Sequence, residues 1–370
     1  MLETAAAIGR RRLEFRCFDQ ELATMSFVRN RRVKSGVAAL LIALSTLGVS
    51  MAGAAADLRA VPIGLVHSAA SASLYIGVAN GYFTDEGLDA QIKFFNADLL
   101  VQRAVAEGKL DFGVVSLTAS FFDYAAKHRL KIIASQVSDQ AGYPATALLI
   151  NKRAYEAGFR SVKDFPNRRI GMTTPGSGER YTLARIAAKY RLAPDAIKLV
   201  WLKTRAREMA AFSRGEIDAA ALPFVTALEF YSSSKGALLI RLSDFAEWQQ
   251  GVVFTRAQTI EANRPNVEKF MRAYQRSVAE YDLTFQQRDD EGTALPGPHF
   301  REYLMLVAHQ ARLPPELLRY ALPYCDHLAR LDVTDIENQL KFWQGQGMAD
   351  KGITAADLLD LSFLGSHIGR

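Results

Sequence analysis

The stretch "AVAEGKLDFGVV", residues 104–115, decides the fold because the chain contains it a second time in altered form. The second copy, "AFSRGEIDAAAL" at residues 211–222, follows at an offset of 107 residues. In both copies an alanine, a glycine, an aliphatic residue and an aspartate occupy matching positions. A helix that ends at a C′ glycine, Gly108 or Gly215, followed by a tight turn and a buried strand accounts for this pattern. Two such units predict two similar α/β lobes.

The two aspartates of the repeat, Asp111 and Asp218, stand where the expected strands begin. Short polar side chains at such positions bond to nearby backbone groups and fix the turn. We therefore expect both aspartates to be structural, and we assign no catalytic role to them.

Around the repeat, residues 60–255 alternate short β-rich runs with helical patterns. This alternation is typical of α/β layers built around mostly parallel sheets. We expect strands at residues 60–66, 89–95, 111–115, 130–135, 145–150, 168–173, 198–202, 217–222, 236–240 and 251–255.

From residue 260 onward the pattern becomes helical. Apolar residues spaced for one helix face run from Val267 to Tyr281, and we expect them to be core. Thr334 and Glu337 have the spacing of a capping box and predict the start of another helix. Residues 288–300 form a loop by their proline and glycine content.

The composition is that of an ordinary globular protein large enough for two lobes, with 49% hydrophobic and 23% charged residues in 370. Residues 1–56 carry eight Arg or Lys and four Asp or Glu, so they supply four of the six net positive charges and leave about +2 for the rest. A nucleic-acid partner requires a basic face or stripe. We therefore expect no nucleic-acid partner.

The start of the chain has the pattern of an export signal. The basic run "RNRRVK" (29–34) precedes residues 35–56, which contain no charged residue, and Ala54 and Ala56 fit an A-x-A cleavage site before Asp57. The alternative is an uncleaved membrane anchor, because 22 uncharged residues could span a bilayer. We expect export with cleavage after Ala56, and hence a periplasmic protein.

Residues 1–24 lengthen the charged region beyond what a signal needs, so Met25 is a candidate for the true start. Cys17 falls in this leader, which leaves Cys325 as the one thiol of the exported chain. No disulfide can then form within that chain. We expect Cys325 to be a small buried side chain.

The segment "RRIGMTTPGSGERYTLARIAAKY", residues 168–190, combines a strand, a small-residue turn and a helix start. The first N–H groups of a helix lack intrahelical partners and face a positive dipole end, so such a turn can hold an anion. Gly176 and Gly178 would let backbone N–H groups approach a negatively charged head group, and Ser177 would add a hydroxyl donor. We expect this turn to hold the head of a small organic acid.

The remaining ligand candidates follow from the rule that open α/β sheets bind ligands at the carboxyl ends of their strands, next to helix starts. Ser73 is a candidate N-cap for the helix that carries Tyr75, and Arg205 could supply a full positive charge. The candidate ligand-binding residues are His67, Ser68, Ser73, Tyr75, Ser116, Thr118, Gln136, Thr173, Thr174, Ser177, Gly178, Arg205 and Pro223.

Enzyme and metal chemistry find little support in the sequence. His67, at a strand end, is either a hydrogen-bond donor to an anion or a histidine with partners inside the protein, and the other histidines have no spacing that suits a metal. No Lys-Ser/Thr follows the glycines of "TPGSGER" (174–180), so we do not expect a phosphate loop. We expect no catalytic residue, no metal and no cofactor.

Four segments, taken in order, resemble periplasmic solute-binding proteins of ABC importers. The resemblance is to the nitrate, sulfonate and taurine group, which is also similar to thiamine-pyrimidine precursor binders; it covers residues 60–255 well and the helical remainder loosely. It also points best to Ser116, Thr118, Ser177 and Gly178. The segments are "LYIGVANGYFTDEGLDAQIKFF" (74–95), "AVAEGKLDFGVVSLT" (104–118), "SVKDFPNRRIGMTTPGSGERYTLARIAAKYRL" (161–192) and "AFSRGEIDAAALP" (211–223).

The resemblance implies a type II periplasmic binding protein fold, with two α/β lobes, a ligand cleft between them and two crossings of a hinge. The first lobe would comprise residues 58–147 plus 251–370, and the second lobe residues 148–250. Such lobes close on their ligand by hinge motion.

The function that the resemblance implies is capture of a small anionic solute, a sulfonate or carboxylate that can be aromatic, and its delivery to an ABC permease with its ATPase. We expect a monomer. An enzyme on the same fold, similar to thiamine-pyrimidine synthases or menaquinone-pathway enzymes, and a periplasmic ligand sensor remain alternatives.

Overall fold

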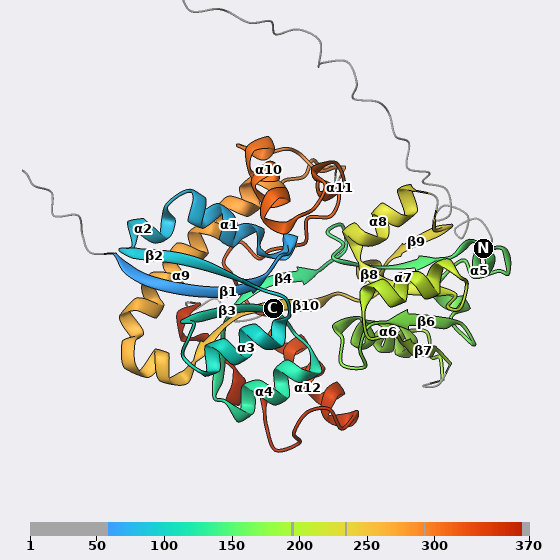
Figure 1. Cartoon of the computed structure of the whole chain (residues 1–370), viewed down its shortest axis with the longest axis horizontal. Helices are drawn as coiled ribbons and strands as arrows, with labels where there is room; N and C mark the ends of the chain where they lie inside the picture. Colours follow the sequence, from blue (N-terminus) through green and yellow to red (C-terminus); the bar gives the residue numbers. More distant parts are fainter. Residues whose placement is uncertain (1–57, 194–195, 234, 292, 365–370) are drawn as a thin grey trace, which may run out of the picture. The chain divides into compact units, whose positions relative to one another are not determined.

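The computed structural model describes residues 58–364 except 194–195, 234 and 292. The expected signal peptide, its cleavage site and the candidate start at Met25 lie outside the described residues. Within the described part, ten strands form two five-stranded sheets (Figure 1). We call the residues of each sheet and its covering helices the first lobe and the second lobe.

The first lobe has the strand order β2-β1-β3-β10-β4. β1 is parallel to β2 and β3, whereas β10 is antiparallel to β3 and β4. The strands are β1 (Arg59–Val66), β2 (Leu88–Phe95), β3 (Phe112–Ser116), β4 (Leu130–Asp139) and β10 (Trp248–Arg256). Its helices are η1 (Ala69–Ser71), α1 (Ala72–Ala79), α2 (Tyr82–Asp85), α3 (Asp98–Ala106), α4 (Ala119–Lys127), α9 (Ala257–Phe285), α10 (Phe300–Ala311), α11 (Pro315–Leu318), α12 (Val333–Gly345), α13 (Ala355–Leu358) and η4 (Leu361–Phe363).

The second lobe has the order β7-β6-β8-β5-β9, with β6 parallel to β7 and β8, and β5 antiparallel to β8 and β9. The strands are β5 (Thr146–Ile150), β6 (Arg169–Met172), β7 (Lys198–Trp201), β8 (Ala219–Pro223) and β9 (Leu238–Arg241). Its helices are α5 (Lys152–Glu156), η2 (Val162–Asp164), α6 (Gly178–Lys189), α7 (Arg205–Ser213), α8 (Phe224–Ser232) and η3 (Leu242–Asp244).

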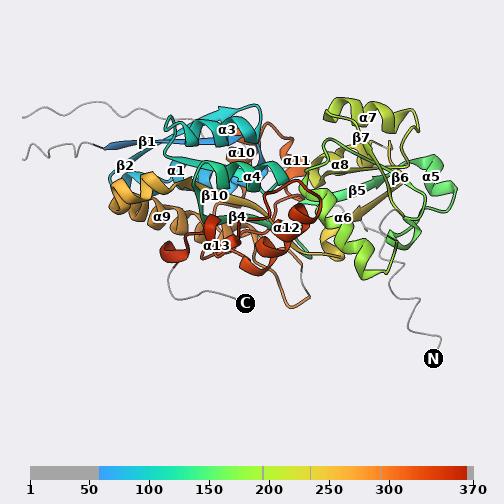
Figure 2. The same ribbon diagram turned by 90° about the horizontal axis from the view of Figure 1, so that it is seen from below.

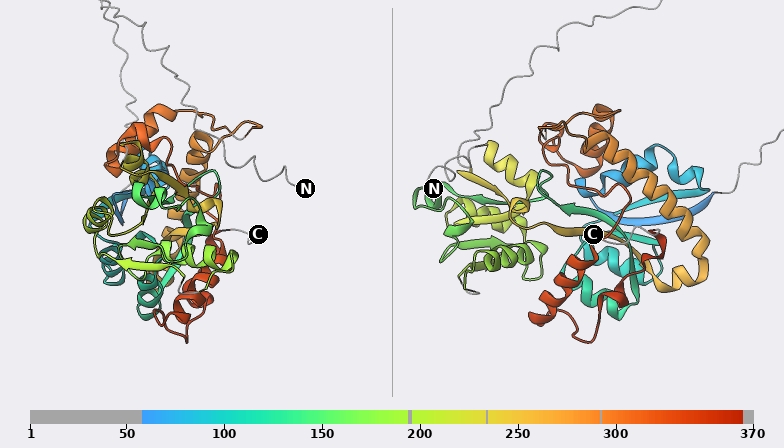
Figure 3. Two further views of the ribbon diagram at one scale, coloured as in Figure 1. Left: turned by 90° about the vertical axis from the view of Figure 1, so that its right-hand side faces the viewer. Right: turned by 180° about the vertical axis from the view of Figure 1, so that it is seen from behind.

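All ten expected strands are present, and the expected mostly parallel direction holds for four of the five strands in each sheet, whereas β10 and β5 run against the others. A parallel neighbour needs a crossover segment on its own sheet, whereas β10 and β5 enter their sheets from the other one and run antiparallel. The largest differences in strand ends occur at β4, which continues to Asp139, and at β10, which begins at Trp248. These paired strands run from the first sheet toward the second (Figure 3).

The chain passes between the two sheets at residues 140–145 and again at residues 242–247. The boundaries that the sequence suggested, 147/148 and 250/251, therefore fall inside β5 and β10.

The internal repeat has the structure that its pattern predicts. α3 and α7 end just before Gly108 and Gly215, whose φ values of 76° and 70° are left-handed. The repeat also extends into the preceding strands: a Cβ added to Gly64 would lie 2.3 Å from Leu110 Cδ1, and one added to Gly171 would lie 2.3 Å from Ile217 Cδ1. Each glycine thus lets the side chain before the next strand pack on the sheet.

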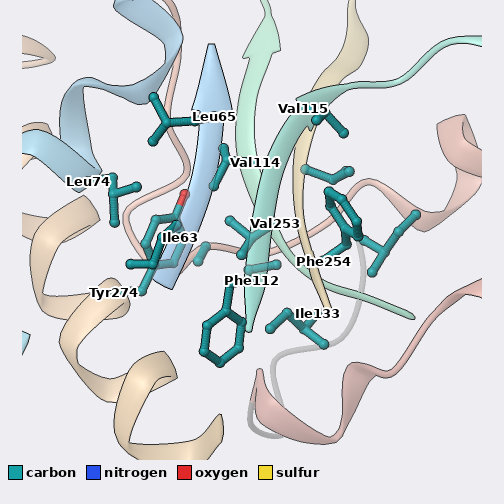
Figure 4. Packing of buried hydrophobic residues seen from close by; sticks show 14 of the residues in the cluster. Ile63, Leu65, Leu74, Phe112, Val114, Val115, Ile133, Val253, Phe254 and Tyr274 are labelled. Carbon is teal, nitrogen blue, oxygen red and sulfur yellow. The ribbon is translucent and has the colours of Figure 1, made fainter. Parts of the chain in front are cut away.

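The core of the first lobe lies on both faces of its central strands (Figure 4). Ile63, Val114 and Val253 come from three neighbouring strands and are fully or almost fully buried. Such double burial explains the near-continuous apolar runs of these strands. The expected apolar stripe from Val267 to Tyr281 is buried in α9 against this core.

Two expected helix caps are wrong. The N-cap of α12 is Asp332, whose carboxylate accepts the N–H of Asp335 at 2.8 Å, so Thr334 lies inside the helix. A 3₁₀ turn precedes α1, so Ser71 is the N-cap residue there and Ser73 lies in the first turn, buried.

Among the described helices none is long and apolar enough to cross a membrane.

Candidate functional site

The candidate site lies where the carboxyl ends of strands in the two lobes come together. The turn after β6 contacts the start of α4, because the N–H of Ala119 donates to the carbonyl of Gly176 at 3.0 Å. Helix α4 follows β3 of the first lobe, and α6 follows β6 of the second. The structure therefore brings together two of the loops that the carboxyl-end rule selected.

The glycines of the turn are needed for packing between the lobes. A Cβ on Gly178 would lie 2.1 Å from Trp248 Cη2, and one on Gly176 would lie 3.0 Å from Ala119 Cβ. Ser177 occupies the N-cap position of α6 with an extended backbone, but its hydroxyl makes no capping bond. That hydroxyl oxygen is buried and has no hydrogen-bond partner among the described residues. It is thus a free donor at the start of a 12-residue helix.

Helix α6 is fixed to the first lobe through a buried carboxylate on α12, and the two helices lie near each other in Figure 2. Tyr181 Oη donates to Asp335 Oδ1 at 2.7 Å, and Arg185 Nη1 lies 3.0 Å from the same oxygen. The N–H of Gln249 donates to Asp335 Oδ2 at 2.8 Å. Burial raises the pKa of Asp335 despite these donors. This cluster, which the sequence did not indicate, joins α6, α12 and β10.

Arg180 is a second residue that the sequence reading missed. Its guanidinium donates to the carbonyl of Pro175 at 3.0 Å and to Gln346, and it lies over the ring of Trp201 at 5.6 Å. Burial lowers the pKa of Arg180, and none of the ion pairs of the described residues includes it. Because Gln346 stands 166 positions away in sequence, no local pattern could have found this contact.

A buried aspartate connects the two strands that lead between the lobes. Asp139, at the end of β4, accepts from Ala145 N at 2.7 Å, from the hydroxyl of Thr146 and from Trp248 Nε1 at 3.3 Å. Burial raises its pKa to about 6, and the hydrogen bonds oppose that shift. The same indole packs on Gly178, so the crossing strands and the turn are in contact through one side chain.

His67 and Ser68 lie at the end of β1. His67 Nδ1 donates to the carbonyl of Gln310 at 2.7 Å, and its ring stacks on Phe94 at 3.9 Å. Phe94 is 37% exposed, so the pair offers an aromatic surface, and His67 Nε2 has no hydrogen-bond partner among the described residues. Ser68 caps η1 by accepting the N–H of Ala70 at 3.1 Å.

Ser116 is the last residue of β3, Thr118 follows that strand, and both are half-buried. The N–H of Ser116 donates to Asp98 Oδ2 at 3.1 Å, and Thr118 caps α4 by accepting the N–H of Phe121 at 3.2 Å. Both residues therefore have structural bonds, and their exposed fraction still allows ligand contact.

Three candidates are buried inside the first lobe. Ser73 and Gln136 are core positions, and Gln136 Nε2 donates to Ser71 Oγ at 3.0 Å. Tyr75 is also buried, its hydroxyl has no hydrogen-bond partner among the described residues, and burial raises its pKa to about 12.

Four further candidates in the second lobe are exposed or half-buried. Thr174 and Pro223 are exposed and Thr173 is half-buried. Arg205 pairs with the fully buried Glu208 and donates to the carbonyl of Ala221 at 3.1 Å. Burial raises the pKa of Glu208 to about 8 even though Arg205 opposes the shift. The charge of Arg205 is therefore largely engaged within its own lobe.

Cys325 is buried, as expected, and its thiol donates to the carbonyl of Gln136 at 3.3 Å. Burial raises the pKa of this thiol far above its usual value. A buried neutral thiol is a poor nucleophile. In the part of the chain that the structure describes, no group of three or more His, Cys, Asp or Glu side chains could hold a metal ion.

A family model described as NMT1/THI5 like matches residues 68–282. No curated protein matches the chain.

Similar solved structures include two sulfonate-binding proteins and a nitrate-binding protein. The alkanesulfonate-binding protein SsuA from Xanthomonas axonopodis pv. citri, bound to MOPS, is 18% identical with a TM-score of 0.60, over 82% of this chain and 99% of that one. The periplasmic aliphatic sulphonate binding protein SsuA from Escherichia coli is 16% identical with a TM-score of 0.62, over 81% and 91%. The periplasmic nitrate-binding protein NrtA from Synechocystis PCC 6803 is 11% identical with a TM-score of 0.61, over 83% and 87%. The two α/β lobes are thus the fold of periplasmic binding proteins.

Proposed function

The chain belongs to the NMT1/THI5-like family, and from this premise we propose that it is the substrate-binding component of an ABC importer. It would act in the periplasm as a monomer and deliver its ligand to a permease and its ATPase. The binding proteins of the same fold, which bind sulfonate or nitrate, support this role.

One observation carries the proposal: the start of α6, with the unpartnered hydroxyl of Ser177, lies against the start of α4 from the other lobe. Helix starts direct N–H groups and a positive dipole end at an anion. Ser177 would add a hydroxyl donor, and His67 would add a ring nitrogen.

The proposed ligand is a small organic sulfonate or carboxylate. The stacked pair of His67 and Phe94 would contact its carbon skeleton, which favours a bulkier or aromatic acid over nitrate. A charge-assisted hydrogen bond contributes about 1.5–3 kcal/mol, so a few donors with some apolar burial would give micromolar binding.

The test is a calorimetric titration with sulfonates, nitrate, carboxylates, aromatic acids and pyrimidines. Ser177→Ala should weaken the best anion by about tenfold or more, whereas Ser232→Ala, an exposed serine at the end of α8, should leave it unchanged. Equal affinity in Ser177→Ala would overturn the proposed site. Preference for a neutral pyrimidine would overturn the anionic ligand.

Two further measurements would distinguish transport from sensing and from catalysis: the response of the permease complex to the loaded protein, and the chemical fate of the bound compound. Ligand-stimulated hydrolysis of ATP by the cognate permease complex would support import, whereas binding without such stimulation would point to a sensor. Turnover of the bound compound would point to an enzyme. The burial of Cys325 disfavours only an enzyme that would use this thiol as its nucleophile, because the one thiol of the described residues is not accessible.

A further inference from the structure

A second polar site lies in the first lobe, at the end of the sheet where β1 begins, whereas the candidate ligand site lies where β1 and β3 end. It is a pocket of about 220 Å³ beside the beginning of β1 and the end of β10. One water molecule occupies roughly 30 Å³, so a tetrahedral oxyanion fits with room to spare. The lining residues are Arg59, Asp111, Arg256, Gln258, Thr259, Ala262 and Asn263.

The internal repeat supplies a comparison for this pocket. The second lobe has an aspartate at the matching position, but the carboxylate of that aspartate is bonded by a neighbouring arginine. Ile63 pairs with Phe112 across β1 and β3, and Ile170 pairs with Ala219 across β6 and β8, at the offset of the repeat. Asp111 of the first lobe therefore corresponds to Asp218 of the second.

Both carboxylate oxygens of Asp218 accept hydrogen bonds from one neighbour, Arg169. Asp218 accepts from Arg169 N at 2.8 Å and from Arg169 Nη2 at 3.0 Å. The position that corresponds to Arg169 in the first lobe is Pro62, which has neither a guanidinium nor a backbone N–H.

Asp111 consequently accepts no hydrogen bond from any described residue, and its one ion pair, to Arg59 Nη2, is long at 3.8 Å. Burial raises the pKa of Asp111, although Arg59 and Arg256 oppose the shift. The carboxylate thus keeps its capacity to accept a hydrogen bond from a ligand.

The register of the strands puts Asn151 of the second lobe at the position that matches Arg256, so this guanidinium belongs to the first lobe. A Cβ on Gly108 would lie 2.7 Å from Arg256 Nη1, so the guanidinium rests directly over this residue. In the part of the chain that the structure describes, the buried atoms Arg256 Nε and Thr259 Oγ1 have no hydrogen-bond partner. Buried donors of this kind carry a desolvation cost that a ligand would relieve.

We propose that this pocket binds inorganic phosphate. Arg59 and Arg256 face its negative oxygens, and the Asp111 carboxylate accepts a hydrogen bond from its protonated oxygen. Two guanidinium groups around one carboxylate leave a net positive charge, which selects an anion. At neutral pH phosphate keeps at least one proton, whereas sulfate keeps none. The carboxylate therefore attracts phosphate and repels sulfate.

The test is a calorimetric titration of the purified protein with phosphate and, separately, with sulfate. Phosphate should bind, and sulfate should bind at least about tenfold more weakly. Sulfate has no proton to donate, so one of its negative oxygens would lie against the negative carboxylate of Asp111. Arg256→Gln should weaken phosphate by about tenfold or more. The matched control is Arg169→Gln, which changes the corresponding region of the second lobe and should leave phosphate affinity unchanged.

A pair of glycine variants gives a second route if Arg256→Gln does not fold. Gly108→Ala and Gly215→Ala introduce the same left-handed strain, but only the former displaces an arginine, because a Cβ on Gly215 meets nothing within 4 Å. Only Gly108→Ala should weaken phosphate binding.

Three outcomes would overturn the inference: no phosphate binding at millimolar concentration, equal binding of sulfate, or loss of phosphate binding in Ser177→Ala but not in Arg256→Gln. The last result would place the phosphate at the proposed solute site. The two proposals are thus distinguishable, because each depends on variants that leave the other site intact.

Discussion

Gly178 and Trp248 are packed so closely that the glycine tolerates no side chain. We expect Gly178→Ala to lower the free energy of unfolding by about 1–3 kcal/mol, because the new Cβ would lie 2.1 Å from the indole. Gly345→Ala is the control, since a Cβ there, in the last turn of α12, meets nothing within 4 Å. Urea unfolding of both variants measures the difference.

Equal stability of the two variants would show that the indole moves aside at no cost. The same geometry explains why a larger substitution at this position tests the site poorly: it would disturb the packing between the lobes as well as the anion contacts. Ser177→Ala removes one oxygen and is the sharper probe.

At the residue scale, the sequence could locate the loops that follow the strands, but it could not show which side chains in or near them are buried or what they contact. The carboxyl-end rule selected Thr118 and Ser177, which flank the contact between Ala119 and Gly176, and their role in ligand binding stays a prediction. It could not tell that Tyr75 and Gln136 face the interior, because a polar residue near a strand end has the same pattern in either orientation. Their burial depends on side-chain direction, which local sequence does not fix.

At the element scale, the repeat predicted two copies of one helix-turn-strand unit, because a C′ glycine and a buried apolar run are local signals. The direction of β5 and β10 was not predictable in the same way. Both strands pair with neighbours distant in sequence, and nothing within their own residues distinguishes parallel from antiparallel pairing.

The crossing strands also contain an ionisable group whose effect can be measured. Burial raises the pKa of Asp139 from 3.8 to about 6, so ionising this group costs the folded protein about 3 kcal/mol relative to the unfolded chain. Its favourable contribution is present below the unfolded pKa and is lost as the pH rises through about 6.

We therefore expect Asp139→Asn to gain stability relative to the unchanged protein by up to about 3 kcal/mol as the pH rises from about 4 to about 7. Urea unfolding at both pH values measures this change, and the loss of other hydrogen bonds cancels in the difference. If the difference in free energy of unfolding between the two proteins is the same at both pH values, the pKa of Asp139 is not raised.

At the scale of the whole molecule, export is the first property to test. The run of uncharged residues 35–56 after a basic segment predicts cleavage after Ala56. Intact-mass measurement of protein from the periplasmic fraction should give a chain that starts at Asp57. Recovery of a membrane-bound chain that retains residues 35–56 would contradict this expectation.

Hinge closure is the second property, and it follows from the two crossings at residues 140–145 and 242–247. Opening would break contacts between the lobes, among them the bond from Tyr181 to the buried Asp335. A hydrogen bond to a charged group is worth about 1.5–3 kcal/mol. A ligand at about a hundred times its Kd contributes about 2.7 kcal/mol. Because these energies are similar in size, ligand binding can decide which state is populated.

Small-angle scattering should therefore show a smaller radius of gyration when ligand is added, and Tyr181→Phe should enlarge the difference. Without its hydroxyl the unliganded variant loses one contact of the closed state, while saturating ligand restores the same compact form. Tyr231→Phe, whose ring is 37% exposed on α8, is the control and should behave as the unchanged protein. Identical profiles with and without saturating ligand, in the unchanged protein and in Tyr181→Phe alike, would mean that the lobes do not move and that the ligand enters a preformed site.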